Sequence, residues 1–203
     1  MASHKNRSES GRSDSPQKPP EGRPFEERLG RFLTFVLRHH PEKLDLTLDE
    51  KGSADFEALA TAIRALPGFS RVTRQQIERM VISGPAASRF EILGDRIRAR
   101  YGHTLPTPIE HQPADPPKSL FYGATPAAAI TVLTEGLKAA ERQQVHLSTD
   151  EAAAREFGLR RCADPVILRI NTVGARKTGV KFYPAGPAVW LSDAIPPEFI
   201  SRA

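Results

Sequence analysis

The chain has 203 residues, enough for one large or two small domains, and its formal net charge is +5. The excess of cations favours an anionic partner, and RNA, a nucleotide or a membrane surface all meet that condition. The single cysteine, Cys162, excludes an internal disulfide and a thiolate zinc site. No apolar run reaches the length of a membrane span and the first residues are polar, so we expect a soluble, cytoplasmic protein.

The first half of the chain predicts a helical lobe that ends in a hairpin. Residues 1–23 are mostly polar or proline, which predicts a disordered tail. Apolar residues recur at helical spacing from Phe25 to Leu37, and Pro41 follows the basic end of that helix. Leu44, Leu46 and Leu48 alternate with polar residues and predict a short strand. Next come a helix over 56–63, a helix opened by the capping box of Thr73 and Gln76, and a hairpin of 90–93 with 96–101 around Gly94-Asp95.

This order of elements is typical of a winged-helix lobe, which we expect over residues 24–103. Winged helices bind nucleic acids, but they also serve as dimerisation modules. Residues 104–118 contain five prolines and predict a linker. Residues 119–203 then carry short β-rich runs with two helices, near 127–133 and 150–157, which predicts a compact lobe with mainly antiparallel strands. The expected fold class is therefore α+β. No glycine-rich nucleotide loop and no metal motif is present in the sequence.

The alternation of residues 96–101 is the most informative local pattern. It places Arg96, Arg98 and Arg100 on one face of a strand and the apolar residues between them on the other. Three guanidinium groups at this spacing repel one another unless anions lie between them, and arginine matches phosphate oxygens in bidentate fashion. A phosphate-binding face and a solvated outer face both remain open from these residues alone.

Other candidate residues also allow two interpretations. Arg38 and His39 end a helix, where they complement its dipole or bind a ligand. His103 marks either a strand exit or a phosphate contact. His146, inside the strand-like run 145–148, needs a polar partner from the core or from a ligand. Arg142 precedes that strand as a loop cation or a ligand contact.

Taken together, five of these motifs resemble the RNA 2′-phosphotransferase family, also called KptA. The similarity extends from about Phe25 to Ile200, with the motifs in the family's order. They are Leu37-Arg38-His39, Ile97-Arg98-Ala99 with Gly102-His103-Thr104, Arg142, Val145-His146-Leu147-Ser148, and Val189-Trp190-Leu191 with Pro196-Pro197.

The resemblance implies an N-terminal winged-helix-like lobe that binds RNA and a C-terminal lobe with the fold of NAD-dependent ADP-ribosyltransferases. It also implies a protein that consumes NAD⁺ as co-substrate, requires no metal and acts on RNA carrying an internal 2′-phosphate. We expect a monomer, because two basic lobes around a cleft need no partner. The products are RNA with a 2′-hydroxyl, ADP-ribose 1″,2″-cyclic phosphate and nicotinamide. The implied site comprises a catalytic quartet, Arg38, His39, Arg98 and Arg142, and NAD contacts at Tyr122, Gly123, His146 and Ser148. With them we expect RNA phosphate contacts at Arg96 and Arg100, from the arginine face of the strand, and at His103.

The chain departs from the family pattern at the start of the C-terminal lobe. The family carries His-Gly-Thr there, whereas this chain has Tyr122-Gly123-Ala124. A tyrosine hydroxyl can still donate one hydrogen bond, but it cannot become cationic at neutral pH. Two alternatives to RNA 2′-phosphotransfer therefore remain: ADP-ribosylation of an RNA terminal phosphate, and a non-catalytic module that binds RNA phosphate.

Overall fold

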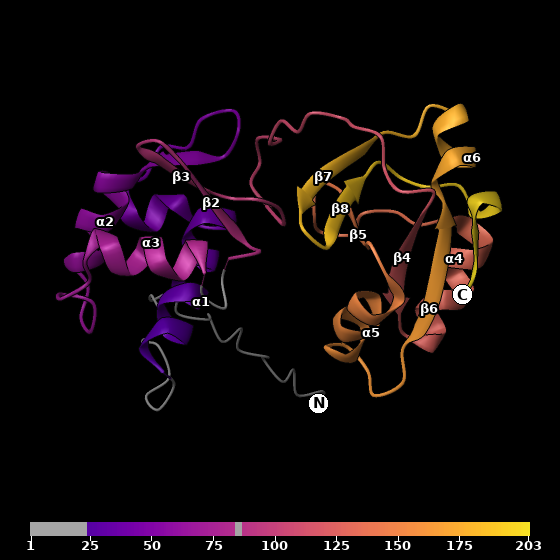
Figure 1. Cartoon of the computed structure of the whole chain (residues 1–203), viewed down its shortest axis with the longest axis horizontal. Helices are drawn as coiled ribbons and strands as arrows, with labels where there is room; N and C mark the ends of the chain where they lie inside the picture. The colour runs from indigo at the N-terminus through magenta and orange to yellow at the C-terminus, as the bar shows by residue number, and fades with distance from the viewer. Residues whose placement is uncertain (1–23, 84–86) are drawn as a thin grey trace, which may run out of the picture.

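Two antiparallel sheets organise the chain, and each lies in its own body with its own helices (Figure 1). The computed structural model describes residues 24–83 and 87–203. Within them, the first sheet has the strand order β1-β3-β2 and the second the order β7-β8-β5-β4-β6-β9. The described residues also form six α-helices. The expected α+β class with antiparallel pairing is therefore confirmed.

The first body places its helices over the three-stranded sheet. Its elements are α1 (Phe25–Arg38), η1 (Pro41–Leu44), β1 (Ser53–Asp55), α2 (Phe56–Arg64), α3 (Arg74–Ile82), β2 (Phe90–Leu93) and β3 (Arg96–Ala99). The predicted capping box opens α3, because Thr73 accepts from the backbone of Gln76 and the Gln76 side chain accepts from the backbone of Thr73. In β3, Ile97 and Ala99 are buried, which confirms the alternation along this strand.

The strand predicted over 44–48 is wrong. Residues 41–44 form the short 3-10 helix η1, and Asp45 follows in the left-handed region with φ 52°. Leu44, Leu46 and Leu48 instead pack as partly buried residues against the core beneath them. Alternation of apolar residues satisfies one-sided packing whether or not a partner strand is present. The strand that pairs with β3 is β1, over residues 53–55, which the pattern did not predict.

The second body surrounds the six-stranded sheet. Its elements are β4 (Ser119–Ala124), α4 (Pro126–Glu135), β5 (Val145–Ser148), α5 (Glu151–Leu159), β6 (Val166–Asn171), α6 (Thr172–Lys177), β7 (Phe182–Gly186), β8 (Val189–Ser192), η2 (Pro197–Phe199) and β9 (Ile200–Arg202). Thr125, Asp150 and Asn171 cap α4, α5 and α6 by accepting a backbone N–H. The helices predicted near 127–133 and 150–157 are present as α4 and α5, the short strands are antiparallel as predicted, and α6 is an additional helix.

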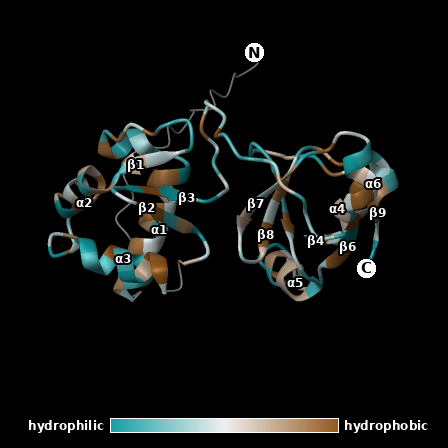
Figure 2. Ribbon diagram, turned by 45° about the horizontal axis from the view of Figure 1, so that its top comes forward, coloured by the Kyte–Doolittle hydropathy of each residue, from teal (hydrophilic) through white to brown (hydrophobic). Residues whose placement is uncertain are grey.

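The segment between the two bodies forms no helix or strand from 100 to 118, yet it is tied to the second body. The Gln143 amide donates to the carbonyls of Leu105 and Thr107, at 3.0 and 2.9 Å, and its oxygen accepts from Ile109 N–H at 2.9 Å. Ala114 N–H donates to the Phe182 carbonyl at 2.9 Å. In Figure 2 this segment is mostly teal, while brown residues gather within both bodies. The segment is thus polar but anchored at several points.

The disordered tail predicted over residues 1–23 lies outside the residues that the structure describes. Among the helices that are described, none is long and apolar enough to cross a membrane.

Candidate active site

A cavity of about 260 Å³ lies where the two bodies meet, and its described lining is strongly basic. Arginine contributes five of the lining side chains, and no aspartate or glutamate belongs to the described lining. The five are Arg38, Arg89, Arg142, Arg160 and Arg161. A cluster of guanidinium groups without carboxylates raises the potential for anions such as phosphates. The cavity therefore suits a polyanionic ligand.

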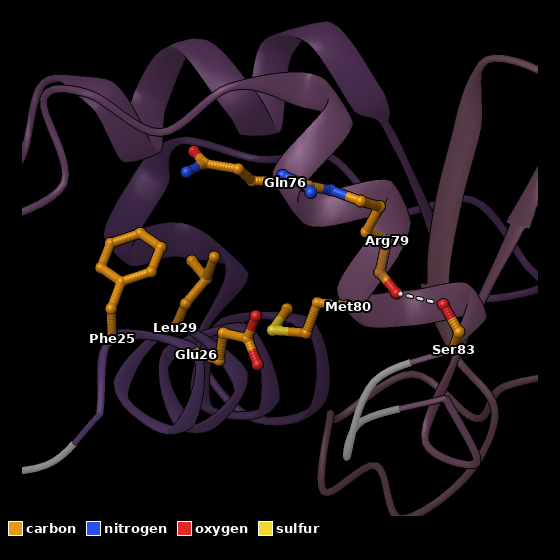
Figure 3. Close-up of a pocket in the computed structure, with 7 residues that line it drawn as sticks. All are labelled: Phe25, Glu26, Leu29, Gln76, Arg79, Met80 and Ser83. Atoms are coloured by element: carbon orange, nitrogen blue, oxygen red, sulfur yellow. Dashed lines mark hydrogen bonds between the residues drawn. The ribbon is translucent and has the colours of Figure 1, made fainter.

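A second hollow, of about 400 Å³, lies between α1 and α3 (Figure 3). Apolar side chains and one acid line it together with Arg79, and the Arg79 carbonyl accepts from the Ser83 hydroxyl at 3.2 Å. None of the residues predicted for the site belongs to this lining. Its larger volume does not make it the better candidate, because it offers no convergent set of donors.

Arg38 enters the cavity from the end of α1. It is only 7% exposed, its guanidinium carbon lies 4.7 Å from the centre of the Tyr101 ring, and Nε and Nη2 are buried without a hydrogen-bond partner. Its pKa is lowered to about 10, mainly by burial and to a smaller extent by the charge of Arg142, while Tyr101 raises it. Buried donors are costly when unpaired, so these two nitrogens can donate to a ligand at no loss of bonds within the protein.

Gly102 brings the guanidinium groups of Arg38 and Arg142 together. Its φ is +87°, a conformation that residues with a side chain rarely adopt. A Cβ at this position would lie 3.2 Å from Nη1 of Arg38 and 3.4 Å from Nη1 of Arg142. The bare backbone of Gly102 therefore makes room for two cations that converge from different bodies.

Arg142 is carried by the loop that precedes β5, and its neighbour fixes that loop. Gln143 makes the three hydrogen bonds to residues 105–109 described above, so the backbone at Arg142 is held against the crossing segment. Partial burial of the Arg142 guanidinium and the charge of Arg161 lower its pKa, while Tyr101 and Tyr122 raise it. The sequence carried no signal for Gln143, because its partners are backbone groups far along the chain.

His146 has a fixed tautomer. Nδ1 lies 3.1 Å from the Gln144 carbonyl oxygen, which can only accept, so Nδ1 carries the proton. Burial lowers the His146 pKa to about 3, and Nε2 is buried without a partner. Nε2 of the neutral ring is thus a hydrogen-bond acceptor facing a lining rich in donors. The ring also packs edge-on to Tyr101, with centroids 5.6 Å apart.

Three other predicted NAD contacts lie at the same cavity: Tyr122, Gly123 and Ser148. Gly123 allows α5 to pack against β4, since a Cβ there would lie 2.1 Å from the Ala154 carbonyl oxygen. Tyr101 is a residue that sequence reasoning left on an apolar strand face. It lies between Arg38 and His146, and it packs with Ala185, Val189 and Leu191 of the second body.

His39 is not part of the described lining but adjoins it through Arg38. Its Nδ1 lies 2.8 Å from the Thr104 hydroxyl, and burial together with Arg38 lowers its pKa. His103 is 3% exposed, its Nε2 is buried without a partner, and burial lowers its pKa to about 3. A Cβ on Gly52 would lie 3.1 Å from that nitrogen. Its role as an RNA phosphate contact stays a prediction.

The arginine face of β3 already carries anions, and they are carboxylates. Glu91 Oε2 accepts from Nε and Nη2 of Arg98 at 2.8 and 2.6 Å, and its Oε1 lies 3.0 Å from Nη1 of Arg100. Arg96 pairs with Asp49 at 3.0 Å. The repulsion expected along this face is therefore relieved within the chain, and the three arginines do not belong to the described lining of the cavity. Their assignment to RNA phosphate and catalysis stays a prediction.

The two histidines with pKa values of about 3 predict a loss of stability in acid. An unfolded histidine titrates near pH 6.5, so between about pH 6.5 and 3 the unfolded state binds protons that the folded state does not. Their contribution is fully present above about pH 6.5 and is lost as the pH falls. For His103 we expect the free energy of unfolding to decrease by up to about 1.4 kcal/mol for each unit by which the pH falls. For the half-buried His146 we expect a smaller decrease. Urea unfolding at pH 7.5, 6 and 5 measures this, and His103→Leu should flatten the slope; an equal slope in that variant would contradict the assignment.

The basic cavity suits phosphorylated ligands, and comparison with known proteins identifies the family that the chain resembles. Residues 25–194 match the family described as RNA 2′-phosphotransferase, Tpt1 / KptA family. A probable RNA 2′-phosphotransferase of Thermococcus kodakarensis is 35% identical over 181 residues, covering 89% of this chain and 99% of that protein. One of Lacticaseibacillus paracasei is 36% identical over 85% of this chain and 91% of its own length.

The chain thus belongs to the RNA 2′-phosphotransferase, Tpt1 / KptA family, and it is a transferase with that activity. The family acts on RNA and uses NAD as co-substrate. The resemblance inferred from the five sequence motifs is confirmed.

Proposed function

We propose that the arginine-lined cavity holds NAD⁺ and the RNA 2′-phosphate side by side and catalyses phosphate transfer between them. The observation that carries the proposal is the pair of buried, unpartnered nitrogens of Arg38 in a lining without carboxylates. The residues present fit a dinucleotide. Guanidinium donors suit its pyrophosphate, and the Nε2 acceptor of His146 suits a ribose hydroxyl.

The division of labour between the bodies is part of the proposal. Residues 24–103 serve as a winged-helix-like RNA-binding lobe, residues 104–118 as a linker, and residues 119–203 as the ADP-ribosyltransferase-like lobe that binds NAD⁺. Three helices with the sheet order β1-β3-β2 support the first assignment, and the six-stranded antiparallel sheet supports the last. A cavity lined from both bodies needs no second copy of the chain, which favours a monomer.

In the first step, an oxygen of the 2′-phosphate attacks the anomeric carbon of the nicotinamide ribose, and the bond to nicotinamide breaks. The phosphate is already ionised near neutral pH, so the step needs no strong base. It needs two anions held close against their repulsion. We assign that task to Arg38 and Arg142, and the convergence of their guanidinium groups at Gly102 supports the assignment.

In the second step, the ribose 2″-hydroxyl attacks the transferred phosphorus, and the bond from phosphorus to the RNA 2′-oxygen breaks. The hydroxyl proton leaves with the RNA product, which regains a 2′-hydroxyl. Negative charge develops on the phosphoryl and departing oxygens, where guanidinium groups stabilise it. We assign assistance in proton transfer to His39, which adjoins Arg38 and has Nδ1 2.8 Å from the Thr104 hydroxyl.

The direct test incubates the protein with NAD⁺ and a short RNA that carries one internal 2′-phosphate. Formation of 2′-hydroxyl RNA, nicotinamide and ADP-ribose 1″,2″-cyclic phosphate in equal amounts supports the proposal. An ADP-ribosylated RNA end without cyclic phosphate would indicate transfer to a terminal phosphate instead. Binding of the RNA without nicotinamide release would indicate a binding module and would contradict the proposal.

Arg98 carries a separate prediction for the second step. The resemblance assigns Arg98 to the catalytic quartet, although it pairs with Glu91 outside the described lining of the cavity. On that assignment, Arg98→Ala should slow the second step more than the first and let ADP-ribosylated RNA accumulate. Quenched time courses resolved by gel electrophoresis measure the intermediate. Arg64→Ala on α2 is the matched control. Unchanged product formation by Arg98→Ala would remove Arg98 from the mechanism and leave its pairing with Glu91 as its role.

A further inference from the structure

Tyr122, which stands where the family carries a histidine, is held by an arginine that the sequence motifs did not include. Tyr122 lies on β4 at the cavity, and Arg161 follows the end of α5. Nη1 of Arg161 donates a hydrogen bond of 2.9 Å to the Tyr122 hydroxyl oxygen, and its guanidinium carbon lies 5.9 Å from the centre of the ring. The two side chains therefore form one unit of the cavity wall.

This contact determines what the Tyr122 hydroxyl offers to a ligand. A guanidinium can only donate, so the hydroxyl oxygen accepts from Arg161 and the hydroxyl proton remains to be donated elsewhere. Arg142 is close enough to both groups for Tyr122 to raise its pKa and Arg161 to lower it, and Arg142 also can only donate. The described lining includes no carboxylate, and the hydrogen bond of the Tyr122 hydroxyl to Arg161 is one that it accepts, so its proton is available to an oxygen brought by the ligand.

We propose that Arg161 is a positioning residue that fixes the Tyr122 hydroxyl as a donor to a phosphate oxygen of NAD⁺. The inference rests on the proposed function and adds a residue pair to it. A phosphate oxygen suits the place because Tyr122, Arg161 and Arg142 line the same cavity, and each of them can donate to an anion bound there. The pair Tyr122–Arg161 thereby supplies the hydrogen bond for which the family pattern uses an imidazole.

Arg160 is the control that distinguishes an effect of Arg161 on the position of Tyr122 from an effect of its positive charge. It lines the same cavity, but its guanidinium carbon lies 4.6 Å above the Phe157 ring instead of reaching Tyr122. Loss of either arginine removes one positive charge from the cavity. Loss of Arg161 additionally frees the Tyr122 hydroxyl, so the two arginines should differ in their energetic coupling to Tyr122.

The experiment is a pair of double-mutant cycles on the full chain, with the Kd for NAD⁺ measured by calorimetry in the absence of RNA. We expect Tyr122→Phe to weaken binding roughly ten-fold and Arg161→Gln to weaken it at least as much. The variant that combines them should bind no more weakly than Arg161→Gln alone. In the second cycle, the variant that combines Tyr122→Phe with Arg160→Gln should lose affinity for NAD⁺ by the product of the two single fold-losses. Arg161→Lys, which keeps a donor and a charge, should restore part of the affinity.

Different results would contradict the role of Arg161 and the proposed binding of NAD⁺. If NAD⁺ binds and the losses from Tyr122→Phe and Arg161→Gln multiply, Arg161 does not act through Tyr122, and the inference is overturned while the proposed function stands. An unchanged Kd in Tyr122→Phe overturns it as well. If the unmodified chain binds no NAD⁺, both fail together. Thermal unfolding of every variant must match the unmodified chain, and Arg161→Lys keeps the test open if Arg161→Gln does not fold.

Discussion

Replacing Arg38 by lysine is expected to slow removal of the RNA 2′-phosphate by at least about 100-fold, although the positive charge is kept. Lysine lacks the planar fork whose Nε and Nη2 are buried and unpartnered in the cavity. It also loses the stacking over Tyr101, so the remaining charge is less well oriented. Single-turnover rates with saturating NAD⁺ measure the effect on the chemical steps.

Arg31→Lys is the matched control on the same helix. The Arg31 side chain is 60% exposed and pairs at 3.3 Å with Glu27 one turn earlier, so its replacement should leave the rate within about two-fold. A rate for Arg38→Lys similar to that of Arg31→Lys would show that charge alone suffices at position 38. In that event the unpartnered nitrogens would not be phosphate donors.

Gly102→Ala is expected to reduce activity by about 100-fold while the protein stays folded. The φ of +87° costs an alanine about 1–2 kcal/mol, and the new Cβ would press on the guanidinium ends of both Arg38 and Arg142. These ends are flexible and would move, so the main loss is in the geometry of the two cations, not in the core. Turnover rates together with urea unfolding separate the two effects.

Gly179→Ala reproduces the backbone strain without the guanidinium contacts. Its φ is +95°, and a Cβ there would meet no atom within 4 Å. We expect a similar loss of stability with nearly full activity. If Gly102→Ala and Gly179→Ala lose activity equally, backbone strain explains the loss of activity. The contacts of Gly102 with Arg38 and Arg142 would then not contribute to it.

Local chemistry in the sequence predicted much of the fold. The capping box of Thr73 with Gln76, the hairpin around Gly94-Asp95 and the alternation of β3 each depend on neighbouring residues and are present. The pattern at Leu44, Leu46 and Leu48 misled because alternation reports burial on one side, not pairing. The strand β1 is only three residues long and gains its identity from β3, more than 40 positions away, which no local window contains.

The sequence motifs predicted six of the residues that line the cavity. Arg38, Arg142, Tyr122, Gly123, His146 and Ser148 share one cavity. The sequence could not show that Glu91 neutralises Arg98, because a cross-strand partner depends on the register of β2 against β3. Gln143 and Arg161 were missed for a related reason: their partners are distant in the chain, and neither residue type signals a particular role.

Tyr101 sets a limit on how this enzyme can be divided. By chain position it belongs to the hairpin end of the first body, but its ring completes a small core with Ala185, Val189 and Leu191 of the second. A fragment cut after residue 103 would expose that ring to water, and the complementary fragment would be left with a gap at the same place. A chimera that combines the first body of one relative with the second body of another should therefore fold well only where the side chains at these four positions fit together. Substitutions in one body at this contact then require matching substitutions in the other.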